Sequence, residues 1–330
     1  LPGAAVSEPF DPRQPAHVER VASWLAGEPI VRLIVILRAV GCGYARGPTG
    51  GCTMCGFSAL TSGGEPVATA DLVAQVEAVL ADPVRLAGVA EVDLYNSGSF
   101  FADDEIPAAA RSAMLARLGG LGLRRVLVES RPEHLTPEKL EAARAALGET
   151  ELEVGIGLES ADDRVREVLV RKGFSRPQFE RAAALLGRAG ARLLAYVVLK
   201  PPGLAEQEAI EDAVRTISWV HATGRQHKVP TRAALEPIFV PAGTALEREF
   251  LAGRYQPPSL WSVAEVVRRA HLFGEILVGL SDEGLAAGRI PAGCPRCTSM
   301  LRQALGRYNR ERRVELLVGL VCPDCHPRPV

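Results

Sequence analysis

Short apolar runs that alternate with amphipathic segments constrain the fold of this chain more than any other feature of its sequence. Residues 31–37 (VRLIVIL) have the length and composition of a buried strand, and residues 69–80 carry apolar side chains at helical spacing. Further strands are expected at 90–95, 125–129, 153–158, 193–199, 234–239 and 276–280, and further helices at 108–118, 137–146, 177–188, 206–219 and 262–273. Strands separated by helices predict a parallel sheet with right-handed crossovers, either an open doubly wound sheet or a complete or partial β/α barrel.

The segments outside this alternation define the expected domain limits. Residues 1–29 are expected to form an N-terminal helical extension with a helix at 17–25, and residues 30–285 the β/α core. Residues 286–330 are expected to form a small C-terminal appendage, because two CPxC units lie there.

Charge and cysteine usage narrow the class of protein. A net charge of −1 argues against a wide nucleic-acid-binding surface, and the lack of an 18-residue apolar run argues against a membrane span. The seven cysteines are an odd number in tight clusters, which is untypical of a disulfide framework. They indicate metal binding or catalysis in a cytoplasmic protein.

Three of these cysteines, Cys42, Cys52 and Cys55, directly follow the first core strand. A structural zinc ion takes four protein ligands, so a zinc site here would need a distant ligand such as His134 or His271. Polar residues also follow the later strands, in NSGSF, ESRPE, GLES and KPPG. Because the carboxyl ends of parallel strands share one edge of a sheet, these groups are expected to converge on one rim.

The motif set resembles that of radical S-adenosylmethionine (SAM) enzymes. The cysteines have the spacing CX9CX2C, and NSGSFF, ESRPEH, GLES and RKGF follow in this order within residues 30–285. The long first gap and the later motifs are most similar to the branch that contains the archaeosine-forming RaSEA proteins and the catalytic subunit of Elongator. The resemblance implies a partial (β/α)6-type barrel and a [4Fe–4S] cluster held by Cys42, Cys52 and Cys55. The fourth iron would bind SAM, which is cleaved to a 5′-deoxyadenosyl radical that abstracts hydrogen from the substrate.

The resemblance also implies roles for rim residues. The SAM-binding residues would be Asn96, Ser97, Gly98, Ser99, Glu129, Arg131, Glu159, Ser160 and Lys200. On the substrate side, the candidate catalytic residues are Glu159, Lys172, Tyr196 and Glu236. Each has a plainer interpretation: a rim ion pair for Glu129 and Arg131, a carboxylate at a helix start for Glu159, and a core tyrosine for Tyr196.

The remaining cysteines, Cys294, Cys297, Cys322 and Cys325, predict a tetrathiolate site. Structural zinc and an auxiliary [4Fe–4S] cluster both suit four thiolates, and we favour the cluster because the resemblance already implies iron loading. Five arginines lie between the two pairs (Arg302, Arg307, Arg310, Arg312 and Arg313), as a solvated helix face or as a dock for phosphate or RNA.

The leading functional hypothesis is a radical SAM enzyme acting on a nucleoside-like or other small metabolite, with an electron donor such as flavodoxin or ferredoxin. An auxiliary cluster would permit sulfur insertion. The alternatives are a tRNA-modifying, archaeosine-type enzyme and a non-enzymatic zinc-binding β/α protein.

Overall fold

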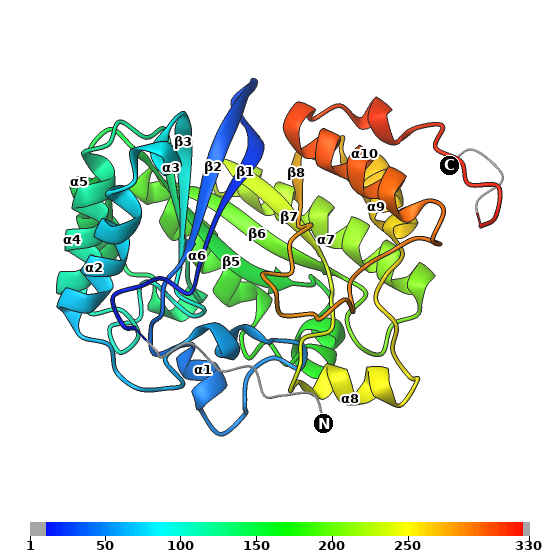
Figure 1. The fold of residues 1–330 in the computed structure, drawn as a ribbon, viewed down its shortest axis with the longest axis horizontal. Coiled ribbons are helices and arrows are strands. Elements are labelled where there is room, and N and C mark those ends of the chain that lie inside the picture. The colour runs from blue at the N-terminus through cyan, green and yellow to red at the C-terminus, as the bar shows by residue number, and fades with distance from the viewer. Residues whose placement is uncertain (1–10, 326–330) are drawn as a thin grey trace.

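Within residues 11–325, which the computed structural model describes, the strands form one curled eight-stranded sheet in chain order (Figure 1). The strands are β1 (His17–Leu25), β2 (Glu28–Ile36), β3 (Val89–Tyr95), β4 (Arg125–Glu129), β5 (Glu151–Glu159), β6 (Arg192–Leu199), β7 (Thr231–Pro237) and β8 (Glu275–Val278). Strands β2 to β8 pair in parallel, and β1 pairs with β2 antiparallel. A doubly wound sheet would reverse its strand order, so the order decides for a half barrel. The predicted partial barrel with a C-terminal four-cysteine extension is confirmed, with β1 as the strand that was not expected.

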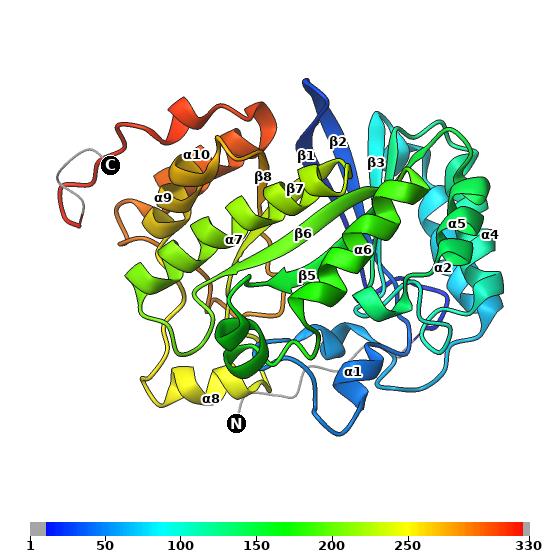
Figure 2. The same cartoon turned by 180° about the vertical axis from the view of Figure 1, so that it is seen from behind.

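The helices that link the parallel strands cover the outer face of the sheet, and Figure 2 shows α6 and α7 on this face, in front of β5 and β6. These helices are α2 (Thr69–Leu80), α4 (Ala108–Gly119), α5 (Pro137–Leu147), α6 (Arg176–Ala189), α7 (Glu206–Gln226) and α9 (Leu260–Ala270). The shorter elements are α1 (Gly43–Arg46), η1 (Phe57–Leu60), α3 (Pro83–Leu86), η2 (Pro132–His134), η3 (Arg164–Leu169), α8 (Ala245–Leu251) and η4 (Val314–Leu317), and α10 (Thr298–Glu311) belongs to the C-terminal extension. None of the helices within residues 11–325 has the length and apolarity needed to cross a bilayer.

The helix predicted at residues 17–25 is wrong, because this segment is strand β1. It forms a hairpin with β2 through a two-residue turn at Ala26 and Gly27, both with positive φ, so that Leu25 pairs with Glu28. Its apolar residues are spaced three and four apart as well as two apart, which imitates a helical pattern. The neighbouring strand β2 supplies hydrogen-bond partners that a nine-residue helix in isolation would lack. Residues 1–10 of the predicted extension lie outside the described residues.

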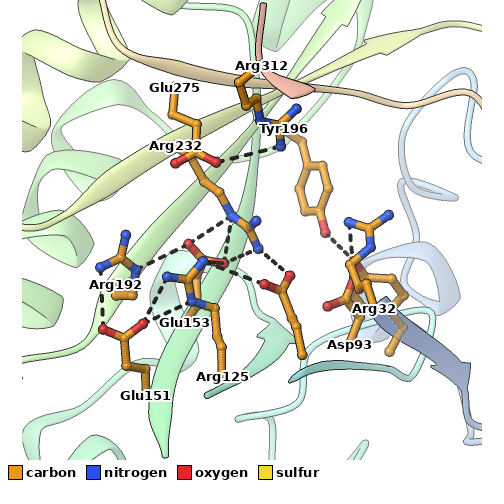
Figure 3. A network of polar contacts seen from close by, with 12 residues as sticks. Arg32, Asp93, Arg125, Glu151, Glu153, Arg192, Tyr196, Arg232, Glu275 and Arg312 are labelled. Atoms are coloured by element: carbon orange, nitrogen blue, oxygen red, sulfur yellow. Dashed lines mark hydrogen bonds and ion pairs between the residues drawn. The ribbon is translucent and has the colours of Figure 1, made fainter. Parts of the chain in front are cut away.

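The concave face of the sheet carries a buried layer of charges at its amino end (Figure 3). Arg232 of β7 contacts Glu153 of β5, with Nε 2.9 Å from Oε2, and Glu91 of β3, with Nη2 2.6 Å from Oε1. All three side chains are fully buried. Burial opposes ionisation of Glu91, but the surrounding arginines still lower its pKa to about 2. This layer fills the barrel interior that other folds fill with aliphatic side chains.

Helix α10 covers the open edge of the half barrel. The side-chain amide of Asn309 makes two hydrogen bonds with the backbone of Val278 in strand β8. Its Nδ2 donates to the carbonyl oxygen of Val278 (2.7 Å), and its Oδ1 accepts from the N–H of Val278 (3.0 Å). The hydroxyl of Tyr308 donates to the carbonyl oxygen of Ile276 (3.2 Å). These bonds satisfy edge groups that would otherwise attract another strand.

Candidate functional site

The three-cysteine loop leaves β2 at the carboxyl edge of the sheet, as predicted. Cys42 stands directly before α1, and the loop docks on the segment after β5: the N–H and hydroxyl of Thr53 donate to the carbonyl oxygens of Val170 (3.0 Å) and Leu169 (2.8 Å). The hydroxyl of Tyr44 donates to the carbonyl oxygen of Arg171 (2.8 Å). The loop is thus held from one side while its cysteine thiols carry no disulfide.

The NSGS segment after β3 lies directly against this loop. A Cβ atom on Gly98 would overlap the carboxylate of Glu105 and lie 3.0 Å from the backbone nitrogen of Cys42, so only glycine fits. Asn96 and Ser99 are fully buried. Two buried side-chain oxygens in this segment, Oδ1 of Asn96 and Oγ of Ser97, have no protein partner. Unpaired buried oxygens are unfavourable, so they indicate a ligand donor at this place.

Glu105, which the sequence analysis missed, joins the two segments. Its Oε1 accepts from the N–H of Gly43 (2.7 Å) in the cysteine loop, and its Oε2 accepts from the N–H of Ser99 and from Asn96. Glu105 is buried, with 3% of its surface exposed. One side chain therefore sets the distance between Cys42 and the NSGS segment.

We expect Glu105→Gln to weaken SAM binding about 10-fold, because the amide would point an N–H at a backbone N–H and leave a buried donor unpaired. Equilibrium dialysis of reconstituted protein with labelled SAM measures this. Asp104→Asn is the control, since its neighbouring carboxylate is exposed and pairs only with Arg46. Equal SAM affinity in the two variants would contradict a positioning role for Glu105.

Arg131 lies beside the cysteine loop, but its guanidinium group is already engaged. It donates to the carbonyl oxygens of Lys172 (2.8 Å) and Gly173 (3.1 Å), pairs with Glu133, and stacks 4.3 Å from the ring centroid of Tyr44. It thereby ties the end of β4 to the segment after β5. A direct contact of Arg131 with the SAM carboxylate stays a prediction.

The end of β5 brings Glu159 and Lys172 together, with Nζ 2.7 Å from Oε1. Glu159 has φ of 66°, which turns the chain sharply at the strand end. Ser160 points elsewhere, because its hydroxyl donates to Asp212 of α7 (2.9 Å). Lys200, also at positive φ, pairs with Glu206 (2.7 Å). The structure therefore places Glu159 and Lys172 together, and Ser160 and Lys200 in contacts with helix α7.

Acidic and tyrosine side chains meet on the concave face below the rim. The hydroxyl of Tyr196 lies 3.3 Å from that of Tyr95 and next to Glu129, and Figure 3 shows it directed toward the Arg32 and Asp93 pair. Burial raises the pKa of Glu129 to about 7. Burial, with Glu283, Glu159 and Glu129 nearby, raises the pKa of Glu236 to about 8. Of these groups, Tyr95 and Glu283 were not predicted, since an isolated residue on a strand or loop gives no signal.

The pKa of Glu236 predicts a pH effect on stability. The folded chain keeps this proton up to about pH 8, whereas the unfolded chain loses it near 4.5, so stability falls as pH rises through this window. We expect Glu236→Gln to have a higher melting temperature than the parent protein at about pH 9, and the same melting temperature near pH 5. Thermal unfolding across this range tests it, with exposed Glu141→Gln as control. A constant difference between Glu236→Gln and parent at every pH would refute the raised pKa.

The arginines of the C-terminal extension are largely committed to protein contacts. Arg302 donates to the carbonyl oxygens of Leu280 and Pro291, Arg307 pairs with Glu311 (3.1 Å), and Arg312 pairs with Glu275 (3.6 Å). These contacts favour the interpretation of a helix face over that of a phosphate dock.

Comparison with known proteins assigns the family. Archaeosine synthase subunit beta of Methanosarcina acetivorans is 31% identical over 298 residues, which cover 88% of this chain and 83% of that protein. The chain belongs to the archaeosine synthase subunit beta family. A second member, from Thermococcus kodakarensis, is 29% identical over 92% of both chains. No protein-family model matches the chain.

The fold of this family member agrees with that assignment. The archaeal Methanocaldococcus infernus Elp3 superposes with a TM-score of 0.51 at 14% identity, over 73% of this chain and 59% of that one. Archaeosine synthase subunit beta and Elp3 are radical SAM proteins, so the resemblance inferred from the motifs is confirmed.

The residues at the rim fit the cofactors that a radical SAM protein implies. Cys42, Cys52 and Cys55 are unpaired and at least partly accessible, as cluster ligands must be. The unpartnered oxygens of Asn96 and Ser97 belong to the segment that lies against this loop, and they suit the amine of SAM. The thiols would hold a [4Fe–4S] cluster, and the NSGS segment would hold SAM.

Proposed function

We propose that this family member is the radical SAM subunit of an archaeosine-synthase-type enzyme, which takes a hydrogen atom from a modified nucleoside in tRNA so that a bond next to the radical breaks. When bound, the cluster supplies the electron that cleaves SAM to methionine and the 5′-deoxyadenosyl radical, with flavodoxin or ferredoxin as the reductant. The observation that carries the proposal is that the cysteine loop and the NSGS segment lie against each other at the carboxyl edge of the sheet, with Tyr196, Glu129 and Glu236 on the concave face below them.

The chain's own residues divide the work in this proposal. Glu105 and Arg131 hold the cysteine loop against the NSGS segment and the β5 end. Glu159 and Lys172 form an ion pair at the rim, which is suited to hold a ribose hydroxyl by hydrogen bonds. Tyr196 and the carboxyl groups of Glu129 and Glu236 face the concave side, where they would bind a substrate rich in N–H donors. Carboxyl groups that stay protonated near neutral pH can donate as well as accept.

The tRNA substrate is preferred to a free small metabolite because of the relatives' name, archaeosine synthase. A free nucleoside is the second candidate, supported by the near-neutral charge and by the paired arginines of α10. As a subunit of such an enzyme, the chain would also bind a partner protein.

Anaerobically reconstituted and reduced protein tests the proposal. With SAM we expect 5′-deoxyadenosine, and we expect its yield to rise when tRNA carrying the archaeosine precursor is added. A rise with the free nucleoside but not with tRNA would replace the substrate proposed here. Absence of 5′-deoxyadenosine above background with a fully loaded cluster would reject the radical SAM function.

A further inference from the structure

The four C-terminal cysteines form one compact group. Cys294 and Cys297 stand at the start of α10, and Cys322 and Cys325 follow η4. The sulfur atom of Cys294 lies 3.5 Å from that of Cys297 and 3.5 Å from that of Cys322. The sulfur atoms of Cys297 and Cys325 lie 3.7 Å apart. All four lie within 4.8 Å of one another. No disulfide joins them.

We propose that these cysteines bind a single tetrahedral zinc ion and not an auxiliary iron–sulfur cluster. Four thiolates at about 2.3 Å from one zinc ion are about 3.8 Å apart, close to the distances observed. In a [4Fe–4S] cluster each thiolate binds a different iron, so the four sulfur atoms stand on the outside of an eight-atom body and cannot come into contact. The distances therefore leave room for one ion and not for a cluster.

The three-cysteine loop provides a contrast inside the same chain. Among the described residues, the four C-terminal cysteines are the only group of three or more His, Cys, Asp or Glu side chains whose ligand atoms all lie within 4.8 Å of one another. The thiols of Cys42, Cys52 and Cys55 are farther apart than this. Wider spacing is what a multi-iron cluster needs. The two cysteine sites thus differ in geometry as well as in ligand number.

The surroundings of the four sulfur atoms suit bound thiolates. The backbone N–H groups of Asp324 and Cys325 lie near the sulfur of Cys322, and the indole of Trp261 lies near those of Cys297 and Cys325. A Cβ atom on Gly293 would lie 2.5 Å from the sulfur of Cys297, so a larger residue there would disturb the site. Donors around the sulfur atoms stabilise the excess negative charge of a tetrathiolate ion.

The position of the site gives the ion a structural role. It joins the start of α10 to the segment after η4, and α10 carries the Asn309 and Tyr308 contacts that cover strand β8. Arg296 of one CPxC unit and Asp324 of the other add an ion pair (3.2 Å). Zinc would hold the extension over the open edge of the half barrel. A zinc ion at this site contains no sulfide that could be inserted into a substrate, so the expected sulfur insertion would have no source. The zinc site is independent of the proposed radical function.

Metal analysis of the Cys42→Ala/Cys52→Ala/Cys55→Ala variant, purified anaerobically, tests the inference. This variant lacks the ligands of the radical SAM cluster but retains the C-terminal cysteines. We expect about one zinc ion per chain and no iron or acid-labile sulfide. Retention of iron with sulfide would overturn the proposal, as would a folded chain without zinc.

Two further measurements keep the inference falsifiable if that variant does not fold. Zinc-edge X-ray absorption of the unaltered protein should show four sulfur ligands at about 2.3 Å. Cys322→Ser/Cys325→Ser should lose zinc and melt at a lower temperature while the iron content stays unchanged. Loss of half the iron in this variant, or nitrogen and oxygen ligands in the spectrum, would refute a tetrathiolate zinc site.

Discussion

Cys52→Ala is expected to lose the iron of the three-cysteine loop and to produce no more 5′-deoxyadenosine than the reagents alone. Cys52 is one of only three thiols available to the cluster, and the loop around it is fixed to the β5 end by Thr53. Substitution of a residue that only supports a metal ligand already lowers metal affinity or activity about 10- to 100-fold. Loss of a ligand should therefore lower the 5′-deoxyadenosine yield more than about 100-fold. Iron content and 5′-deoxyadenosine yield measure the effect, and zinc should be retained.

The matched control is Met54→Leu. Met54 lies in the same loop, packs against the apolar cluster around Ile238 and is not a ligand candidate, so it should keep iron and activity. If Cys52→Ala retained iron and SAM cleavage at the level of Met54→Leu, the assignment of this loop as the cluster site would be wrong.

Arg232→Met is expected to lower the free energy of unfolding by about 3–5 kcal/mol, the largest stability effect we foresee. The substitution removes the closest shared partner of the fully buried carboxylates of Glu91 and Glu153, which then keep only longer contacts with Arg125 (3.6 and 3.8 Å) as a shared partner. An uncompensated buried charge is far more costly than the pair itself. Urea unfolding of the metal-loaded protein measures the change, and its midpoint should fall.

Arg269→Met is the control for Arg232→Met, because Arg269 also pairs with a glutamate, Glu211, but at the surface. Such pairs contribute about 0–1 kcal/mol. Adding Glu91→Gln and Glu153→Gln to Arg232→Met should recover part of the loss, since the charges are then removed. Equal effects of Arg232→Met and Arg269→Met would show that the buried layer is not the stabilising network described here.

The predicted strands were correct in position but often too short at their amino ends. Strand β5 begins at Glu151 and not at 153, β7 at Thr231 and not at 234, and β8 at Glu275 and not at 276. Each omitted segment carries a charged residue. A charged residue at the start of an apolar run is expected to lie in solvent outside the strand. It can be buried in the strand only where oppositely charged side chains from other strands pair with it. The partners of Arg232 lie 79 and 141 residues away, so no local pattern reveals them.

The rim residues were predictable to different degrees. Glu159 and Lys172 were both expected at the rim, but their ion pair was not predicted, because Lys172 lies 13 residues beyond Glu159 in the chain. Glu105 was not predicted, because its role depends on two loops that only the folded chain brings to its carboxylate. Arg131 and Ser160 were placed on the correct edge, but their contacts with Gly173 and Asp212 arise from packing.

By itself the sequence determined the alternation of parallel strands and helices, the three-cysteine loop at the carboxyl edge and the family resemblance, because periodicity and ligand spacing are local properties of a chain. The strand order of the tertiary structure decided for a half barrel and against an open doubly wound sheet. Only the tertiary structure decided that residues 17–25 are a strand, that the barrel interior is charged at one end, and that the C-terminal sulfur atoms stand at single-ion distances. Each of these depends on groups far apart in sequence, and the free energy of burying a charge or a thiolate is set by the partners that folding brings to it.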